Sequence, residues 1–405
     1  MVLAKLTKFN FYLILLLPVA LISGPLISDI IVVLSCLFFC FYYKSYKIKI
    51  FKDKLIIILF LFWLVSVVSS FFSKDILFSL KSSLFYLRII IFILVINIIF
   101  KIKEKDLSKI FNLLALIFIF LFIDSTFQKF FGYNLIGIAL VHPVRVSSFF
   151  GDELILGSYL VKLYPILIAF LYLIKKSKFF FYFLSISLMT FISIFFSAEK
   201  TAIVIFFIEF MFITFLIDKN LKTKLLILLS LIFLFSFMFF SFPKIKDRIF
   251  DQFIINSGNF KYLYTRTHTE HYISGFKIFK DYPLIGVGPK MFRNFCNDKE
   301  YKISEFSCST HPHNYSIQIL AETGIFGFIF FVLFYFFLIR DFFILILQKK
   351  TNKYKFPVYS LLILNLINFM PLFPSGNFFN NWVSITYSLS LGLYFYLKEK
   401  YEENL

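Results

Sequence analysis

The sequence predicts an all-helical integral membrane protein, built as a single polytopic domain over residues 1–405 with about twelve transmembrane helices. Of its 405 residues, 60% are hydrophobic and only 16% are charged, and the mean hydropathy is +0.85. A soluble domain is about 45–50% apolar and about 25% charged. Because one globule cannot bury this much apolar surface, lipid must cover most of it. The composition excludes soluble enzymes, disordered chains and secreted disulfide frameworks.

Twelve apolar stretches are predicted to cross the membrane, since a helix needs about 20 such residues to span the hydrocarbon core. The first two are short and are interrupted by Pro18, Gly24 and Pro25, so a re-entrant hairpin is the alternative there. The twelve stretches are Phe11–Ile22, Ile30–Tyr43, Leu55–Phe72, Leu84–Phe100, Ile110–Phe127, Leu154–Ile174, Phe179–Phe196, Thr201–Ile217, Leu225–Phe242, Tyr315–Ile339, Phe356–Phe373 and Phe378–Leu397.

The formal net charge of +19 predicts the orientation of these spans. Lys and Arg gather in the short loops on the side of the N-terminus, including five Lys between residues 44 and 54. Short basic loops remain in the cytoplasm. Both termini are therefore expected to be cytoplasmic, and the basic charge requires no nucleic-acid partner.

Two outer segments are long: residues 128–153, the first outer loop of this kind, and residues 243–314, which lie between spans nine and ten. Outer loops of this length are usually functional. The second contains HTEHYISGFKIFKD, in which Tyr272, Phe276 and Phe279 recur at three- and four-residue steps. This period predicts a short helix, so short helices are expected over the outer face.

Cys296 and Cys308 lie twelve residues apart in this second outer segment. An oxidising compartment outside the membrane favours disulfides. The two cysteines are therefore candidates for a disulfide.

Arginine is rare in this Lys-rich chain. Only six of its 42 basic residues are Arg, and four of the six fall in the two outer segments: Arg145, Arg248, Arg266 and Arg293. The planar guanidinium binds phosphate and carboxylate with two hydrogen bonds. As a group these residues suggest an outward-facing anion site, with chance retention as the alternative.

The strongest motif is STHPHNYSIQILAETGIFG, which begins at Ser309. It places His313 and Asn314 at the entrance of the tenth span. Gln318 and Glu322 are four residues apart and share one helix face. A carboxylate inside a span is a functional candidate; the alternative is a structural hydrogen-bond acceptor between helices.

These residues resemble a known family. The pattern H-N-x-x-x-Q-x-x-x-E-x-G, preceded by DYPLIGVGPKMF, is similar to the signature of the O-antigen ligase and polymerase family, which are polytopic bacterial membrane glycosyltransferases. RVSSFFGDELILGSYL, from Arg145, and SAEKTAIV, from Ser197, resemble two further family segments. The resemblance covers about residues 145–327.

The resemblance implies a catalytic His313 and basic side chains that hold a diphosphate. Arg145 matches the family's Arg in the first long loop, and Lys200 stands where the family usually has Arg. Arg266 matches a further family Arg only approximately, and His268 competes for that position. His311, Asn314 and Glu322 are expected to complete the substrate-binding set.

The implied reaction is an inverting glycosyl transfer without metal or other cofactor. A neutral His suits the role of general base toward the acceptor hydroxyl, and the cations stabilise the charge on the departing diphosphate. The implied donor is a glycan on polyprenyl diphosphate, and the acceptor is lipid A-core or another glycan. The expected location is the bacterial inner (cytoplasmic) membrane, among its lipids, with the site facing the periplasm.

Several alternatives stay open. Within the family, a ligase in lipopolysaccharide biosynthesis is favoured over a polymerase that joins carrier-linked repeat units. The reason is that the chain has twelve predicted spans and one dominant outer loop late in the sequence. Outside it, the four outer histidines could bind zinc. A polytopic transporter or a membrane scaffold with a glycan-binding loop would not be an enzyme.

Overall fold

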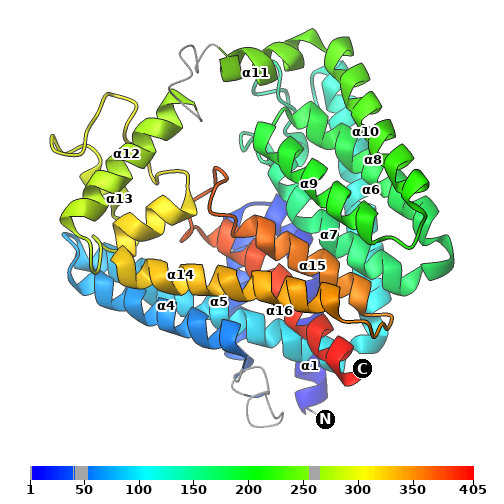
Figure 1. Cartoon of the computed structure of the whole chain (residues 1–405), viewed down its shortest axis with the longest axis horizontal. Coiled ribbons are helices and arrows are strands. Elements are labelled where there is room, and N and C mark those ends of the chain that lie inside the picture. Colours follow the sequence, from blue (N-terminus) through cyan, green and yellow to red (C-terminus); the bar gives the residue numbers. More distant parts are fainter. Residues whose placement is uncertain (1, 40, 42–52, 255–264) are drawn as a thin grey trace.

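The computed structural model describes residues 2–39, 41, 53–254 and 265–405, and this part of the chain contains helices and no strands. Figure 1 shows their arrangement. In chain order the main helices are α1 (Val2–Ile22), α2 (Pro25–Leu37), α4 (Lys54–Phe71), α5 (Ile76–Ile102), α6 (Leu107–Phe131), α7 (Leu156–Ile174), α8 (Phe179–Ser197), α9 (Lys200–Leu216), α10 (Leu221–Ser241), α11 (Pro243–Ile254), α12 (Arg266–Asp281), α13 (Phe292–Phe295), α14 (Tyr315–Leu347), α15 (Lys355–Asn368) and α16 (Asn381–Glu403).

Each of the twelve apolar stretches overlaps a helix, but a count of twelve spans is not confirmed. Within the described residues, eight helices are long and apolar enough to cross a membrane: those over α1, α4, α5, α6, α7, α8, α10 and α14. Helices α2, α9 and α15 have only 13, 17 and 14 residues. The second predicted span, Ile30–Tyr43, also extends into residues outside the described part. The orientation of the termini stays a prediction.

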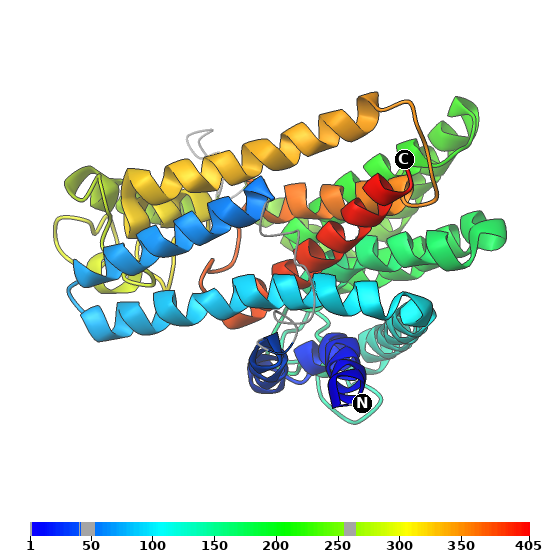
Figure 2. The same cartoon turned by 90° about the horizontal axis from the view of Figure 1, so that it is seen from below.

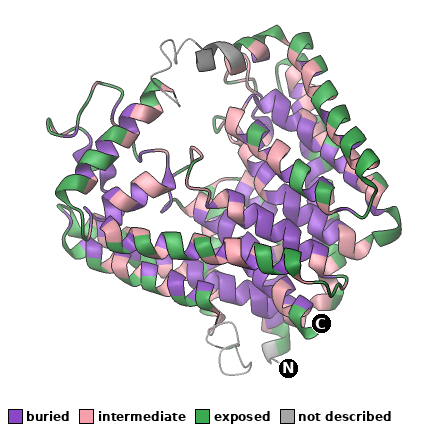
Figure 3. Ribbon diagram, in the orientation of Figure 1, coloured by how far each residue is buried: buried purple, intermediate pink, exposed green. Residues whose placement is uncertain are grey.

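The buried centre of the bundle is formed by α5, α7, α15 and α16, which Figure 3 shows as its most continuously buried helices. Helix α10 is the opposite case, since only 17% of its apolar window is buried inside the protein. Its exposed Leu and Phe side chains suit contact with lipid. The apolar surface that the composition requires to be covered by lipid therefore lies on the outside of the bundle.

Three short helices, α11, α12 and α13, lie between α10 and α14, where the sequence predicts short helices. Helix α12 begins at Arg266, behind the N-cap Thr265, and ends at Asp281, one residue before Tyr282-Pro283. Its buried face is formed by Glu270, His271, Ser274, Gly275 and Ile278 rather than by the three aromatic residues of the periodic pattern. Figures 1 and 2 both place α12 and α13 at one end of α4, α5 and α14.

Helix α14 is broken at Gly324, whose φ of 63° and ψ of −165° are not helical. In a continuous helix, the carbonyls of Ala321 and Glu322 would accept from the N–H groups of Ile325 and Phe326. Because of the break at Gly324, these two carbonyls and these two N–H groups do not bond to each other. Four backbone groups in the middle of a buried helix segment then need other partners, because unpaired backbone groups are costly in such an environment.

The Pro-Leu-x-Gly-x-Gly segment supplies those partners. The N–H groups of Val287 and Gly288 donate to the freed carbonyls over 3.0 and 2.8 Å. The carbonyls of Pro283 and Leu284 accept from the two freed N–H groups over 2.8 and 3.4 Å. Gly286 permits this approach, since a Cβ there would lie 2.5 Å from the backbone of Glu322. The loop after α12 is thereby fixed to the outer part of α14.

Candidate functional site

A cavity of about 1090 Å³ opens among segments that are far apart in the sequence. Its walls come from the α1–α2 turn, the segment before α7, and helices α7 and α9. The remaining wall is formed by residues near 290–293, 310–313 and 367–383. A volume of this size is at the upper end of the range for binding sites of small molecules and cofactors. His311 and His313 both line it.

His313 lies immediately before the N-cap of α14 and has a φ of 55°. A positive φ is uncommon for residues other than Gly, although Asn, Asp and His adopt it more often than most, and strained backbone of this kind is enriched at functional sites. The Ser375 N–H donates to the His313 carbonyl over 2.9 Å, and the Tyr272 hydroxyl donates to it over 3.5 Å. The backbone of His313 is thus held from two directions.

Four imidazole rings meet at this point. The ring centroid of His313 lies 4.0 Å from that of His311 and 5.3 Å from those of His268 and His271. Burial, followed by the charges of His268 and His271, lowers the pKa of His313 to about 4. Burial, followed by His313, lowers the pKa of His311 to about 3. The cavity therefore contains neutral imidazoles at neutral pH.

The zinc site that the sequence leaves open as an alternative would draw on these four rings. Across the part of the chain that the structure describes, no group of three or more His, Cys, Asp or Glu side chains is placed to hold a metal ion.

The segment of residues 369–380, between α15 and α16, supports the entrance of α14. The Asn314 side chain caps α14 through the Ile317 N–H, and its amide donates to the Pro371 carbonyl over 2.8 Å. Gln318 donates to Asn377 over 3.0 Å and accepts from the Phe378 N–H over 2.9 Å. The hydropathy pattern predicts that most of residues 369–380 lie inside the spans Phe356–Phe373 and Phe378–Leu397, whereas the structure places them between two helices. Asn314 therefore acts here as a cap and an anchor.

Glu322 is fully buried and does not line the cavity. One carboxylate oxygen accepts from the Phe292 N–H over 3.2 Å, at the start of α13. The other accepts from the Gln318 side chain over 2.9 Å. These contacts favour the alternative interpretation of Glu322 as a structural acceptor; its place in the substrate-binding set stays a prediction.

Three basic side chains line the cavity together with His313, and two of them, Lys290 and Arg293, come from the segment after α12. Lys290 also has a left-handed backbone, with a φ of 63°. Burial, followed by the charge of Arg293, lowers the pKa of Lys290. The rarity of Arg singles out Arg293 in the sequence, but nothing comparable singles out Lys290 in a Lys-rich chain. The position of Lys290 beside the DYPLIGVG segment could have indicated it.

Arg145 and Lys200 lie beside the cavity rather than in its lining. The Arg145 guanidinium donates to the carbonyls of Leu154 and Ser197 over 2.6 and 3.2 Å, and lies 3.9 Å from the Glu199 carboxylate. It thereby fixes the α8–α9 turn that carries Lys200. Arg248, on α11, donates to the Ala198 carbonyl of the same turn over 3.3 Å. Three cations thus surround one turn.

Arg266 is not brought to this region. Its side chain is 56% exposed, is paired with Glu270 over 2.9 Å and does not line the cavity. Its role as a diphosphate ligand stays a prediction, as does that of Arg145.

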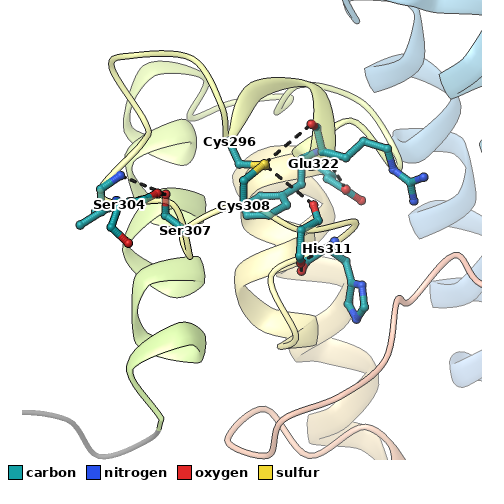
Figure 4. Close-up of a disulfide and its surroundings, with 10 residues drawn as sticks. Cys296, Ser304, Ser307, Cys308, His311 and Glu322 are labelled. Carbon is teal, nitrogen blue, oxygen red and sulfur yellow. Dashed lines mark hydrogen bonds between the residues drawn. A yellow bond between two sulfur atoms is a disulfide. The ribbon is translucent and has the colours of Figure 1, made fainter. Parts of the chain in front are cut away.

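Cys296 and Cys308 form a disulfide with a Cα–Cα distance of 5.0 Å. Figure 4 shows it next to Glu322, while the His311 ring points away from it. The bond closes a loop between α13 and the residues just before His311. It therefore restrains the segment that brings both cavity histidines to α14.

We expect replacement of both Cys296 and Cys308 by Ser to lower the thermal midpoint of the purified protein, because a loop of this length stabilises by about 3 kcal/mol when cross-linked. Addition of reductant to the wild type should have the same effect. Cys36→Ser, at a cysteine outside the disulfide, is the matched control and should leave the response to reductant unchanged. A wild-type midpoint that is insensitive to reductant would contradict the expectation.

The charged side chains of Lys162 and Glu209, which the sequence motifs do not select, also line the cavity. Lys162, on α7, and Glu209, on α9, lie inside helices that the sequence predicts to be spans. The signal that could have found them is their charge, since a single ionisable residue within a span is a functional candidate.

Comparison with known proteins gives one family match. The sequence model of the family described as O-antigen ligase matches residues 164–332. No curated protein matches the chain significantly. The matched segment includes both cavity histidines, Lys290, Arg293 and the break at Gly324, and it confirms the resemblance found in the sequence motifs. Residues 164–332 of this helical membrane protein are therefore similar to the O-antigen ligase family.

Proposed function

We propose that this protein is a membrane glycosyltransferase that moves polysaccharide from a polyprenyl-diphosphate carrier to lipid A-core in the inner membrane, at a site facing the periplasm. The observation that carries the proposal is one cavity in which His313, Lys290 and Arg293 meet. It joins a neutral imidazole with two cations, and it lies between helices that are apolar enough for a membrane. The family match supports the same class of reaction.

The chemistry follows from these groups. The acceptor hydroxyl loses its proton to His313 while its oxygen attacks the anomeric carbon with inversion, and the bond from that carbon to the diphosphate breaks. Negative charge grows on the departing diphosphate, where Lys290 and Arg293 stabilise it. Lys200, next to the cavity-lining Thr201, is a further cation for the diphosphate. No step requires a metal ion.

Deletion of the gene tests the proposal. Complete glycan that remains on the lipid carrier, with bare lipid A-core at the surface, is the expected result in surface-glycan electrophoresis and carrier-lipid analysis. Single repeat units on core would instead indicate a polymerase that joins carrier-linked repeats. Normal surface glycan would overturn both.

The pH dependence of transfer should reflect the low pKa of His313. A general base works only when it is neutral, so the rate should fall as the pH drops through the pKa of the base. With that pKa near 4, transfer should stay nearly constant from pH 7.5 to about 5.5, a range in which an ordinary His would become mostly protonated. Initial rates of the purified enzyme, measured at saturating donor, check this. A midpoint near 6.5 would contradict the assigned environment of His313.

A further inference from the structure

The floor of the cavity is polar at a depth where lipid surrounds the bundle. Lys162 lies about 9 Å along α7 from its first residue, and Glu209 about 14 Å along α9, at 1.5 Å per residue. Asn368 is the last residue of α15. All three line the same cavity as His313. Polar groups at such depth are expensive and are found mainly where they face a pathway or a ligand.

These three side chains leave hydrogen-bonding groups unused. Both carboxylate oxygens of Glu209 are buried, and within the described chain neither has a hydrogen-bond partner. The Lys162 ammonium donates to the Asn368 side-chain oxygen over 3.1 Å, which uses one of its three donors. The Asn368 amide nitrogen is buried without a partner in the same part of the structure. The floor thus offers two acceptors and several donors.

The charges indicate the class of ligand. Glu209 and Lys162 are close enough to interact electrostatically, so each is the counter-charge of the other and the pair favours an ion of neither sign. A neutral, hydroxyl-rich ligand can donate to Glu209 and accept from Lys162 and Asn368 at the same time. Trp382, which also lines the cavity, adds an aromatic surface. This combination fits a sugar ring.

We propose that Lys162, Glu209 and Asn368 form a subsite that binds the hydroxyl groups of a sugar residue of the carrier-linked glycan. The inference rests on the proposed function and adds the side chains that recognise the glycan, separate from the groups that perform the transfer. Glu209 contributes to binding at the expense of fold stability, because its buried carboxyl oxygens accept no hydrogen bond within the described residues, which destabilises the folded state.

The test compares two ligands with the full-length protein in lipid nanodiscs: the carrier-linked glycan purified from the deletion strain, and bare polyprenyl diphosphate. Wild type should bind the glycan-bearing lipid more tightly. Glu209→Met and Lys162→Met should each weaken that binding by about tenfold or more, as expected for loss of a charge-assisted hydrogen bond. Binding of the bare lipid should change little.

The thermal midpoint supplies a second readout. Replacement of both Lys162 and Glu209 by Met should raise it, because no buried charge is then left without its counter-charge; a pair that serves the fold alone would lower it on removal. Thr214→Val is the matched control. Thr214 is a buried residue of α9 outside the cavity lining, and its hydroxyl has no hydrogen-bond partner within the described residues. This variant should keep the preference for the glycan-bearing lipid. Unchanged glycan binding in both Met variants would overturn the subsite alone. A wild type that binds neither lipid would overturn the proposed function.

Discussion

His313→Asn should lower the rate of glycan transfer by a factor of about 10² to 10⁴, the usual contribution of a positioned general base. Asn can donate and accept hydrogen bonds but cannot take up a proton at neutral pH. It also tolerates the left-handed region, where the backbone of residue 313 has a φ of 55°. The substitution therefore removes the base and retains the local backbone. Transfer from purified carrier-linked glycan to lipid A-core, measured with the purified enzyme, gives the rate.

The fold of this variant is checked independently. The carbonyl of residue 313 should still accept from Ser375, so the thermal midpoint of His313→Asn should lie near that of wild type. Binding of the carrier-linked glycan should also persist, because the loss concerns the chemical step. A variant that is folded, binds the donor and transfers at more than about a tenth of the wild-type rate would remove His313 from the role of base.

Gly324→Ala should be among the most destabilising single substitutions in the chain, at about 3–5 kcal/mol. Two costs combine. A residue with a side chain is strained at a φ of 63° by about 1–2 kcal/mol, and the new Cβ would overlap the backbone of Leu284 and Ile285. Relief of that overlap separates the loop after α12 from the break in α14 and leaves buried backbone groups unpaired. The thermal midpoint and the recovery of monodisperse protein from the membrane measure the effect.

Gly137→Ala separates these two costs. Gly137 also has a positive φ, of 90°, but a Cβ there would meet no atom within 4 Å. This control should cost only the backbone strain. If the two variants have the same midpoint, the close contact between the loop after α12 and α14 does not stabilise the protein.

The positions of the helices were predictable because a long apolar stretch leaves the chain one inexpensive conformation in a bilayer. The limits of the helices were less predictable. Residues 369–380 contain four Phe, one Met and one Leu, so hydropathy alone joined most of them to the spans predicted on either side. In the structure they leave the helix at Asn368, because Asn314 and Gln318 supply hydrogen bonds to their backbone. Such tertiary partners are invisible to a local hydropathy pattern.

The candidate site was predictable only in part. The motif around His313 was found because His, Asn, Gln and Glu stand together at a span entrance. The rarity of Arg drew attention to Arg145 and Arg266, and neither lines the cavity. Lys290 could not be distinguished from the many other Lys residues of the chain. Lys162 and Glu209 are single charges inside long apolar helices, with no motif around them. Their meeting depends on how α7, α9 and the loop after α12 pack, which no spacing along the chain reveals.

The shortness of α15 has a consequence for where a lipid-linked substrate is received. At 1.5 Å per residue, α15 rises only about 21 Å, less than the roughly 30 Å of a typical hydrocarbon core. It lies in the buried centre of the bundle, so protein rather than lipid surrounds it, and its last residue, Asn368, lines the cavity. We therefore expect a charged headgroup in this cavity to be held below the membrane surface, while its polyprenyl tail remains in hydrocarbon.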